Sequence, residues 1–484
     1  MELRFAPAAS VGVIVLDEEK PSMTIRANSA ARRDIAYHLH SYTNAKKHEV
    51  DGPLVISSGK GIFVYDDEGR DYLEGLAGLW CVSLGWGEER LVEAATRQLR
   101  TLPYYHSFAH KVPEVLTELA ETLVKMAPVP MSKAYFTNSG SEANDTVVKL
   151  VWYYNNAIGR PNKKKIISRM KAYHGVTVAA ASLAGLPLLH TDFDLPIKNI
   201  LHTDCPHHYR FAQPGESEED FATRLAENLE ALILKEGPDT VAAFIAEPVQ
   251  GAGGVIVPPK TYFEKIQPIL KKYDVLFIAD EVITGFGRTG NMFGTQTFGL
   301  QPDMITLAKA LSSGYQPIAA VLLNEKLYQA IRENSDKNFS FGHGYTYSGH
   351  PVAAAVALET LKIYEERKIV DHVRSVMGHF QKKLRSYAGH PLVGEARALG
   401  LFGALEVVAD KATKMPFALP PKVGPYAQAR AQAHGLLVRA VGDSIVFCPP
   451  LIITEGEIDE LFRRWDPVLD ETLSWVEAQG LKAA

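Results

Sequence analysis

The chain has few cysteines, no large excess of charge of either sign and no long apolar run. Its cysteines, Cys81, Cys205 and Cys448, are too few and too widely spaced for a disulfide framework, which favours the reducing cytosol. The net charge is −5 and the basic residues form no patch of the kind that binds nucleic acid. No apolar run approaches the roughly 20 residues of a membrane span. We therefore expect a cytoplasmic protein with no nucleic-acid or membrane partner.

The first residues of the chain also lack the features of a targeting segment. A short apolar stretch is followed at once by three acidic residues, Asp17, Glu18 and Glu19. A secretory signal needs a longer apolar region, and an organelle transit peptide is poor in acidic residues. We expect neither kind of leader here.

Short apolar runs alternate with amphipathic helical patterns from about residue 130 to 325, which is typical of βαβ units. Because these runs lack polar alternation, they predict strands of a parallel sheet covered by helices on both faces. The runs are residues 134–136, 166–167, 241–246, 275–279, 304–307 and 318–323.

The two ends of the chain differ from this pattern. Residues 58–75 predict a hairpin, and the last 130 or so residues predict helices with one late strand within residues 436–454. The sequence thus predicts an α/β fold with a small α+β domain formed from both chain ends. We assign residues 1–80 to an N-terminal segment with part of the small domain, 81–345 to the large domain and 346–484 to the C-terminal small domain.

Polar or glycine-rich clusters follow these apolar runs directly. Ligands of open α/β sheets bind beyond the carboxyl ends of the strands, so we expect the clusters to meet in one crevice. The clusters read TNSGSEAND, AYHG, AEPVQGAGG, ADEVITGFGRTG and AKALSSG.

The first cluster predicts a helix start that suits a phosphate group. Ser139 and Glu142 match the S-x-x-E capping box. The free N–H groups of such a helix, with the Ser141 hydroxyl, would bind a phosphate monoester. A capped helix without any ligand explains the same residues equally well.

Lys309 and Asp280 each follow or end an apolar strand. Partial burial lowers the pKa of a lysine, so that its neutral amine can form a Schiff base with a carbonyl compound. A buried carboxylate such as Asp280 needs a partner, and the protonated ring nitrogen of pyridoxal phosphate is one. Taken singly, Lys309 is also compatible with a side chain that reaches solvent, and Asp280 with a loop cap. Together with the phosphate cradle they agree on pyridoxal phosphate.

Two further patterns resemble sites but lack the expected context. Residues 285–290, GFGRTG, fit G-x-G-x-x-G without the amphipathic helix that a nicotinamide site requires. The segment with His202, Cys205, His207 and His208 has no familiar zinc spacing. We therefore expect no dinucleotide site and no metal ligands.

The ordered motifs FTNSGSEAND, YHG, AEPVQGAGGV, ADEVITGFGRTG, LAKALSSGYQPI and HGYTYSGHP resemble the class III pyridoxal-phosphate aminotransferases from about residue 35 to 465. GLAGLWCVSLGWG, KLVWYYNNAIGRP, SLAGLPLLH and VRAVGDSIVFCPPLIIT are similar to the ω-transaminase branch. The resemblance implies a fold-type I transferase with a mostly parallel sheet, and pyridoxal 5'-phosphate as cofactor.

The resemblance also implies roles around the cofactor ring. Lys309 would hold the cofactor covalently, and Asp280 would pair with the ring nitrogen. Tyr173 and Val282 would lie on the two ring faces, with Glu247 near the ring oxygen.

The phosphate site implied by the resemblance is shared between two chains. Ser139, Gly140 and Ser141 would bind the phosphate from one subunit, and Thr346 would reach it from the other. The resemblance therefore implies an obligatory homodimer, with a tetramer built from it left open.

The resemblance assigns the substrate pocket to Trp80, Phe108, Tyr173 and Arg439, with Arg439 binding a substrate carboxylate. Core packing also explains Trp80 and Phe108, and a surface position explains Arg439. Ala109 stands where several relatives carry a second aromatic residue, which leaves substrate preference open.

The implied activity is a ping-pong transfer of an amino group to a keto acid, with pyruvate expected. 4-Aminobutyrate, β-alanine, a diamine and an aryl-alkyl amine are all compatible donors. The alternatives are a pyridoxal-phosphate aminomutase or decarboxylating lyase on the same scaffold, and a cofactor-linked regulator. The regulator would need a DNA-binding module, and no basic helix-turn-helix pattern is visible.

Overall fold

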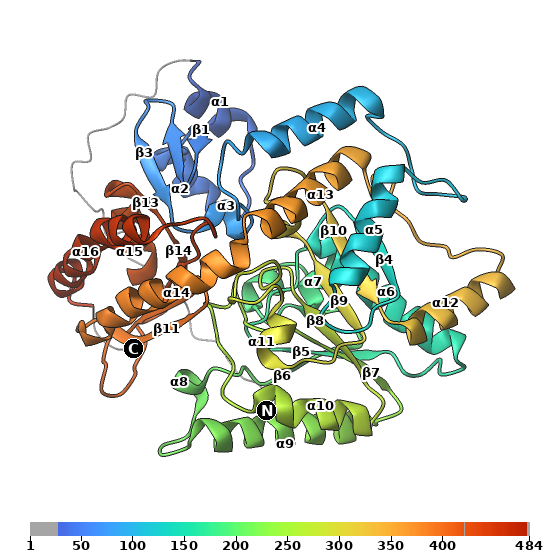
Figure 1. Cartoon of the computed structure of the whole chain (residues 1–484). Coiled ribbons are helices and arrows are strands. Elements are labelled where there is room, and N and C mark those ends of the chain that lie inside the picture. Colours follow the sequence, from blue (N-terminus) through green and yellow to red (C-terminus); the bar gives the residue numbers. More distant parts are fainter. Residues whose placement is uncertain (1–27, 421, 482–484) are drawn as a thin grey trace. The chain divides into compact units, whose positions relative to one another are not determined.

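The computed structural model describes residues 28–420 and 422–481 (Figure 1). The chain divides into two compact units, residues 1–57 with 66–68, and residues 58–65 with 69–484. The described part of the first unit contains α1 (Ala30–Tyr37) and α2 (Ala45–Asp51). The domain division at residues 80 and 345 stays a prediction.

The second unit is built around a seven-stranded sheet of order β4-β10-β9-β8-β7-β5-β6. All its strands run parallel except β10, as the α/β prediction requires. Its strands are β4 (Lys133–Thr137), β5 (Lys165–Arg169), β6 (Ile200–Thr203), β7 (Val241–Ala246), β8 (Leu276–Asp280), β9 (Met304–Leu307) and β10 (Ala319–Leu323).

Helices cover both faces of this sheet, which explains the apolar strands. On β7, Phe244 belongs to one buried cluster and its neighbour Ile245 to another, because successive side chains point to opposite faces. One face packs against α6 (Gly140–Ala157), α7 (Val178–Leu183) and α12 (Glu325–Lys337). The other packs against α5 (Glu114–Met126), α9 (Glu218–Glu236), α10 (Tyr262–Lys272) and α13 (Pro351–Glu366).

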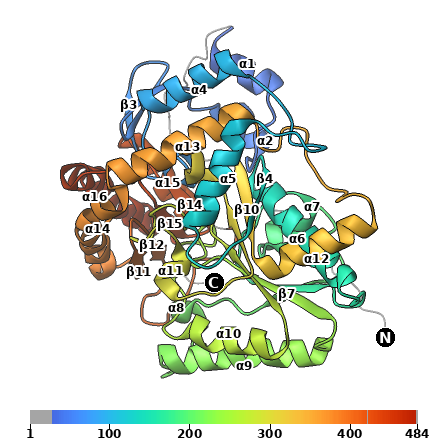
Figure 2. The same ribbon diagram turned by 45° about the vertical axis from the view of Figure 1, so that its right-hand side comes forward.

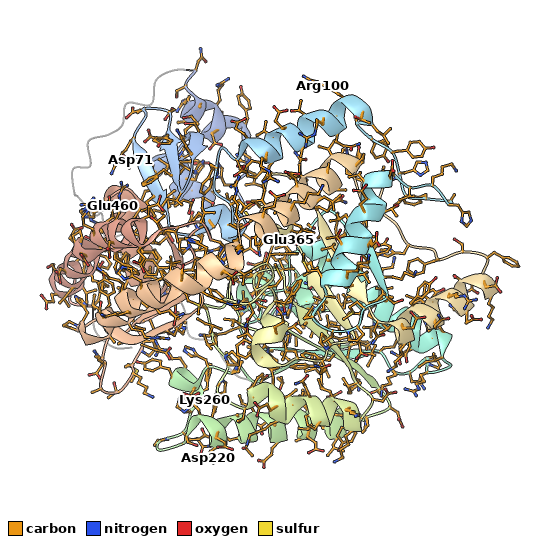
Figure 3. All side chains as sticks on the ribbon, in the orientation of Figure 1. Asp71, Arg100, Asp220, Lys260, Glu365 and Glu460 are labelled. Atoms are coloured by element: carbon orange, nitrogen blue, oxygen red, sulfur yellow. The ribbon has the colours of Figure 1, made fainter. Side chains whose placement is uncertain are left out.

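The outer layer is polar where it meets solvent. Figures 1 and 2 both show α9 beside α10, and Figure 3 labels Asp220 and Lys260 near the left end of this pair. Both residues are exposed, whereas Phe221 of α9 and Phe263 of α10 are buried against the sheet. This division between faces is the one that an amphipathic helix requires.

The orientation of β10 corrects the expectation that every apolar run is a parallel strand. It pairs antiparallel with both β4 and β9. Residues 308–318, which join β9 to β10, hold only the short 3-10 helix η2 (Lys309–Ser312). A parallel connection needs a crossover of about a dozen or more residues, usually a helix, so this shorter link turns the chain back. The strand is apolar throughout because helices cover both of its faces.

The sequence analysis also missed strand β6. Its residues are only partly buried after Ile200, because β6 forms an edge of the sheet and pairs with β5 alone. Half of its short sequence is polar, so no apolar run marked it.

The hairpin predicted within residues 58–75 is confirmed by antiparallel pairing of β2 (Phe63–Asp66) with β3 (Asp71–Glu74). These strands belong to a small sheet of order β1-β2-β3-β13. Its remaining strands are β1 (Ile56–Lys60) and β13 (Leu436–Leu437), and β3 leads toward α3 (Ala77–Trp80) and α4 (Glu89–Thr101).

The C-terminal part contains more strands than predicted. An antiparallel sheet of order β11-β12-β15-β14 packs against helices, and the single late strand expected is divided among β13, β14 (Arg439–Val441) and β15 (Ser444–Phe447). Strands β11 (Val393–Leu399) and β12 (Phe402–Val407) were not predicted, because their charged residues interrupt the apolar pattern. The helices are α14 (Ile369–Ser386), α15 (Val423–Ala433) and α16 (Glu455–Ala478).

The remaining elements are short. They are η1 (Pro187–Leu189), α8 (His208–Phe211), α11 (Gly294–Phe298) and η3 (Tyr387–Gly389). Within residues 28–420 and 422–481, no helix combines the length and the apolar character that crossing a bilayer would require.

Candidate active site

A cavity of about 380 Å³ lies at the carboxyl ends of the parallel strands. Each neighbouring strand delivers its following residues to this edge, as the sequence predicted. Because β10 is antiparallel, the segment before it, Gln316 to Ile318, lines the same cavity. The predicted site residues in its lining are Ser139, Gly140, Ser141, Tyr173, Glu247, Asp280, Val282 and Lys309.

Lys309 begins the short helix η2 just beyond β9 and faces this cavity. Its φ of 47° is in the left-handed region, which a residue other than glycine adopts only when its surroundings impose it. Burial lowers the pKa of its ammonium group, while the charge of Asp280 opposes this shift. Among the described residues its side chain has no hydrogen bond or ion pair. The amine is therefore available to a bound molecule.

Asp280 ends β8 and is 3% exposed. Its Oδ2 accepts a hydrogen bond from Asn144 Nδ2 at 2.8 Å and lies 2.7 Å from His174 Nδ1, while Oδ1 accepts from the Val282 amide at 3.1 Å. Burial alone would raise the pKa of this carboxyl, but the bonds from His174 and Asn144 keep the pKa below its usual range. Asp280 is therefore held as a carboxylate despite its burial.

The side chains that hold Asp280 were missed by the sequence analysis. His174 is fully buried and its Nε2 lies 3.1 Å from Ser168 Oγ, so a hydroxyl fixes the ring on the side away from the carboxylate. Asn144 also donates to the His174 backbone oxygen at 2.7 Å. The signal was present, since Asn144 belongs to the first polar cluster and His174 to the YHG motif.

Helix α6 begins at the predicted position. Ser139 is its N-cap, and its Oγ accepts a hydrogen bond from the Glu142 amide at 3.2 Å. The reciprocal half of the predicted capping box is wrong, because the Glu142 carboxylate accepts from the Asn138 amide at 2.7 Å instead of from Ser139. The helix N-terminus, with its partial positive charge, lies in the cavity wall.

Two glycines keep this end of the cavity free of side chains. A Cβ on Gly175, whose φ is 134°, would lie 2.5 Å from Ser141 Oγ. A Cβ on Gly140 would lie 3.1 Å from Val282. The Ser141 hydroxyl accepts from the Val176 amide at 3.1 Å, which holds the YHG loop against the start of α6. The result is an open, electropositive cradle suited to a phosphate.

The lining fits pyridoxal phosphate on three separate requirements. Lys309 offers an amine without a protein partner, Asp280 offers a buried carboxylate, and the start of α6 offers an anion cradle. Tyr173 and Val282 add surfaces to the same cavity.

Glu247 follows β7 and is 3% exposed. Its carboxylate accepts hydrogen bonds from the Tyr173 amide at 3.0 Å and from the Gly251 amide at 2.9 Å. Burial raises the pKa of this carboxyl. Glu247 therefore ties the loop that carries Tyr173 to the end of β7.

The four other predicted site residues do not line this cavity. Trp80 is 3% exposed and packs in an apolar cluster with Ile283, which does line it. Arg439 is half-buried at the start of β14. The predicted substrate roles of Trp80 and Arg439 stay predictions.

Phe108 and Thr346 lie on neighbouring surface loops. A Cβ on Gly344 would lie 2.6 Å from the Phe108 ring, and Tyr104 donates from its hydroxyl to the Thr346 backbone oxygen at 2.7 Å. Phe108 is 43% exposed and Thr346 is also exposed. Their predicted roles also stay predictions.

The two discounted patterns have structural roles. The loop of residues 285–290 is followed by α11, which has only five residues, and its Arg288 donates to the backbone oxygens of Leu401 and Pro449. His202 and His208 each meet a separate backbone oxygen, at Ala184 and at Glu216.

Glu74 is a buried carboxyl group that the sequence analysis missed. It ends β3 shortly before Trp80, is 6% exposed, and its Oε1 accepts from the Leu76 amide at 2.9 Å. Burial raises its pKa from 4.5 to about 8. This side chain is therefore largely protonated at neutral pH.

Comparison with known proteins agrees with this geometry. Residues 43–469 match the family model described as Aminotransferase class-III. A gamma-aminobutyrate transaminase 1, mitochondrial, from Solanum lycopersicum is 57% identical over 88% of this chain and 83% of its own length. Another from Oryza sativa subsp. japonica is 56% identical over 87% of this chain and 82% of its own length.

Solved structures agree with the fold as well. The omega transaminase from Pseudomonas jessenii in complex with PMP has a TM-score of 0.92 and 56% identity, covering 93% of this chain and 99% of its own. A thermostable 6-fold mutant of an omega transaminase from the same organism has a TM-score of 0.92 and 57% identity over the same shares.

The raised pKa of Glu74 predicts a pH-dependent stability. The folded state binds more protons than the unfolded state between pH 4.5 and about 8, so the contribution of Glu74 to stability falls as pH rises through this window. Glu74→Gln keeps the protonated shape, and we expect it to melt at a higher temperature than the parent at pH 9, with a smaller difference at pH 6. Thermal melts across this range measure the effect. Exposed Glu114→Gln is the control, and a Glu74→Gln difference that is constant with pH would contradict the assignment.

Proposed function

We propose that this chain, which belongs to the class-III aminotransferase family, transfers the amino group of 4-aminobutyrate to pyruvate. The chain is a pyridoxal-phosphate-dependent transaminase of the ω-transaminase branch, acting on ω-amino acids or amines. The names of the relatives support the donor. These relatives do not favour the alternatives of an aminomutase or a decarboxylating lyase.

One observation carries the transaminase chemistry in this chain. The Lys309 amine, the Asp280 carboxylate and the start of α6 line the same cavity. Pyridoxal phosphate, when bound, supplies a ring that spreads the negative charge developing on the substrate carbon. The residues of the chain supply binding, orientation and proton transfer.

Lys309 is the residue that moves the proton in our proposal. Burial lowers the pKa of its side chain, so a larger fraction is the neutral amine near neutral pH. A neutral amine at Nζ would take the proton from the substrate carbon, and the resulting ammonium would deliver it to the carbon on the other side of the transferred nitrogen. The strained backbone and the short helix η2 fix the position of this amine.

Asp280 keeps the opposite end of the site negative. Because His174 and Asn144 hold its Oδ2, the carboxylate cannot rotate away and its pKa stays low. It is suited to hold a proton on the ring nitrogen throughout both half-reactions. His174, Asn144 and Ser168 act as positioning residues through Asp280.

Arg439 is our candidate for binding the carboxylate of pyruvate and of 4-aminobutyrate. A guanidinium binds a carboxylate through two parallel hydrogen bonds. Arg439 lies on the short strand β14, which pairs with β15. Strand β15 contributes Val446 to the apolar cluster that contains Trp80. Trp80 and Phe108 are the proposed walls for the apolar part of the donor.

We also propose that the enzyme is a homodimer in which Thr346 completes the phosphate site of the other subunit. Exposed aromatic residues around Thr346 support this, since large exposed apolar patches mark interaction sites. They are Tyr104, Tyr105, Phe108 and Tyr347. A single-chain mass from light scattering would contradict the proposal.

For location we propose the cytosol, which the free thiols of the three cysteines support. The names of some relatives include mitochondrial or chloroplastic. The test is therefore to fractionate the native cells and to detect the protein in each fraction with an antibody. Recovery in an organelle fraction would contradict it.

The function is tested by two half-reactions in sequence. The purified holoenzyme is mixed with a panel containing 4-aminobutyrate, β-alanine, a diamine and 1-phenylethylamine, and loss of the yellow cofactor absorbance is recorded. Pyruvate or 2-oxoglutarate is then added to the bleached enzyme. We expect 4-aminobutyrate to bleach fastest and pyruvate to restore the colour. Restoration by 2-oxoglutarate alone would overturn the proposed acceptor, and bleaching without need of a keto acid for turnover would overturn the transaminase assignment.

Replacing the amine is expected to separate binding from turnover. Lys309→Ala should retain cofactor through the phosphate cradle and Asp280, yet lose about 10²-fold or more of its turnover, because general acid–base catalysis contributes on that order. Absorbance after gel filtration measures cofactor, and alanine formation measures turnover. Exposed Lys235→Ala is the matched control. Full activity in Lys309→Ala would refute the role.

Removal of the guanidinium is expected to distinguish charged from uncharged substrates. Arg439→Ala should raise the KM for pyruvate by about ten- to a hundredfold, as expected for loss of hydrogen bonds to a charged group. The KM for 1-phenylethylamine, which has no carboxylate, should change far less. The exposed Arg463→Ala serves as control. Equal losses for both substrates would refute the assignment.

A further inference from the structure

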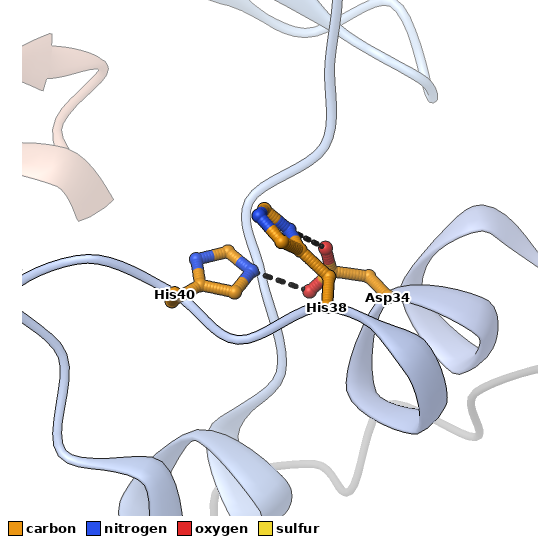
Figure 4. Close-up of side chains that lie close together, drawn as sticks. All are labelled: Asp34, His38 and His40. Carbon is orange, nitrogen blue, oxygen red and sulfur yellow. Dashed lines mark hydrogen bonds and ion pairs between the residues drawn. The ribbon is translucent and has the colours of Figure 1, made fainter.

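Three imidazole rings converge on one carboxylate in the first compact unit, apart from the proposed active-site residues. Asp34 Oδ1 lies 2.9 Å from His38 Nδ1, and Asp34 Oδ2 lies 2.7 Å from His40 Nε2 (Figure 4). His48 Nε2 lies 3.0 Å from the same Oδ2. We propose that Asp34, His38, His40 and His48 form a binding site for a divalent transition-metal ion such as Zn²⁺.

The local sequence brings these side chains together. Asp34 and His38 are four residues apart at the end of α1, so they lie on one face of the helix. His40 follows the last residue of α1, Tyr37, by three residues, and His48 comes from α2. The ring centroids of His38 and His40 are 4.4 Å apart, and those of His40 and His48 are 4.1 Å apart. All four ligands therefore come from a segment of 15 residues and need no distant element.

The donor set suits zinc. Imidazole nitrogens and a carboxylate oxygen are its common ligands, at about 2.0–2.2 Å, in tetrahedral geometry. Ligand atoms in such a tetrahedron are about 3.3 Å apart. The nitrogen–oxygen separations here are 2.7 to 3.0 Å, so the side chains would move apart to admit an ion between them. The ligand atoms of Asp34, His38 and His40 all lie within 4.8 Å of one another.

Charge also favours a cation at this point. The recorded ion pairs of Asp34 within the described part of the chain are with these three histidines, and none is with a lysine or arginine. Without a metal, each nitrogen that faces the carboxylate must carry a proton to form its hydrogen bond. A divalent ion would replace these protons and accept the lone pairs of neutral rings.

A second histidine and carboxylate cluster shows the contrast. His207, Glu395 and Glu406 also bring their ligand atoms together. There Arg397 Nη1 lies 2.7 Å from Glu395 and 2.8 Å from Glu406, so a guanidinium already neutralises both carboxylates. Because a guanidinium already occupies that position, the cluster around Asp34 is the better suited to a metal ion of these two clusters in the described residues.

The cluster is also reachable from solvent. The side chain of His38 is 63% exposed, whereas that of His48 is 11% exposed. The site thus has an outer ligand and an inner ligand, so an ion can enter without opening the core.

The test uses the untagged holoenzyme after treatment with a chelator, and it does not depend on the proposed transaminase function. Zn²⁺ is titrated in competition with a chromophoric chelator, and Co²⁺ is added separately to record its visible spectrum. We expect one Zn²⁺ per chain that the chelator competes for, and a Co²⁺ spectrum typical of four-coordinate nitrogen and oxygen ligands. Absence of zinc binding by the parent enzyme would overturn the proposal.

Variants locate the ion. His40→Ala and Asp34→Asn should each weaken Zn²⁺ binding by at least about tenfold and change the Co²⁺ spectrum. His379→Ala is the matched control, since His379 is a partly exposed histidine paired with Asp459 elsewhere in the chain. Circular dichroism confirms that each variant is folded. Binding that is unchanged in His40→Ala and Asp34→Asn, or equally weakened in His379→Ala, would overturn the assignment.

Discussion

The buried carboxylate of Asp280 is the group on which the rest of the site depends. A charge at the end of a strand covered on both faces is costly unless it is paired, and here His174, Asn144 and the Val282 amide satisfy it. Those contacts fix the start of the YHG loop and a turn of α6 around the same point. The start of α6, the Asp280 carboxylate and the Lys309 amine are thereby held in one cavity, and the geometry of each limits that of the others.

Strand β10 gives the cavity its other wall. Its antiparallel direction follows from the short connection that carries Lys309, so the same backbone constraint positions the amine and turns the chain. A longer crossover with a helix would have made β10 parallel to β9. The residues before β10 would then lie at the opposite edge of the sheet, away from Lys309. The position of Lys309 and that of residues 316–318, which line the same cavity, therefore both follow from one short connection.

The buried and half-buried carboxyl groups of this chain differ in their partners and therefore in their pKa. Glu74 and Glu247 are buried without a basic side chain donating to their carboxylates, and burial raises the pKa of both. Glu406 is buried with Arg397 and is held well below its usual pKa. Asp34 is partly exposed, and within the described residues its ion pairs are with three histidines. The surroundings of each carboxyl group, more than whether it is Asp or Glu, decide its state. They determine whether the group is protonated, is paired as an anion, or is suited to bind a metal ion.

The sequence by itself determined the α/β class, the hairpin of β2 and β3, and the cavity residues Lys309 and Asp280, because apolar runs and the polar clusters after them are local patterns. It also carried the family motifs over most of the chain. Tertiary structure alone decided the direction of β10, the edge strand β6, and the bonding of His174 to Asp280. These depend on contacts between residues far apart in the chain, where pairing partners and burial, not local periodicity, set the outcome.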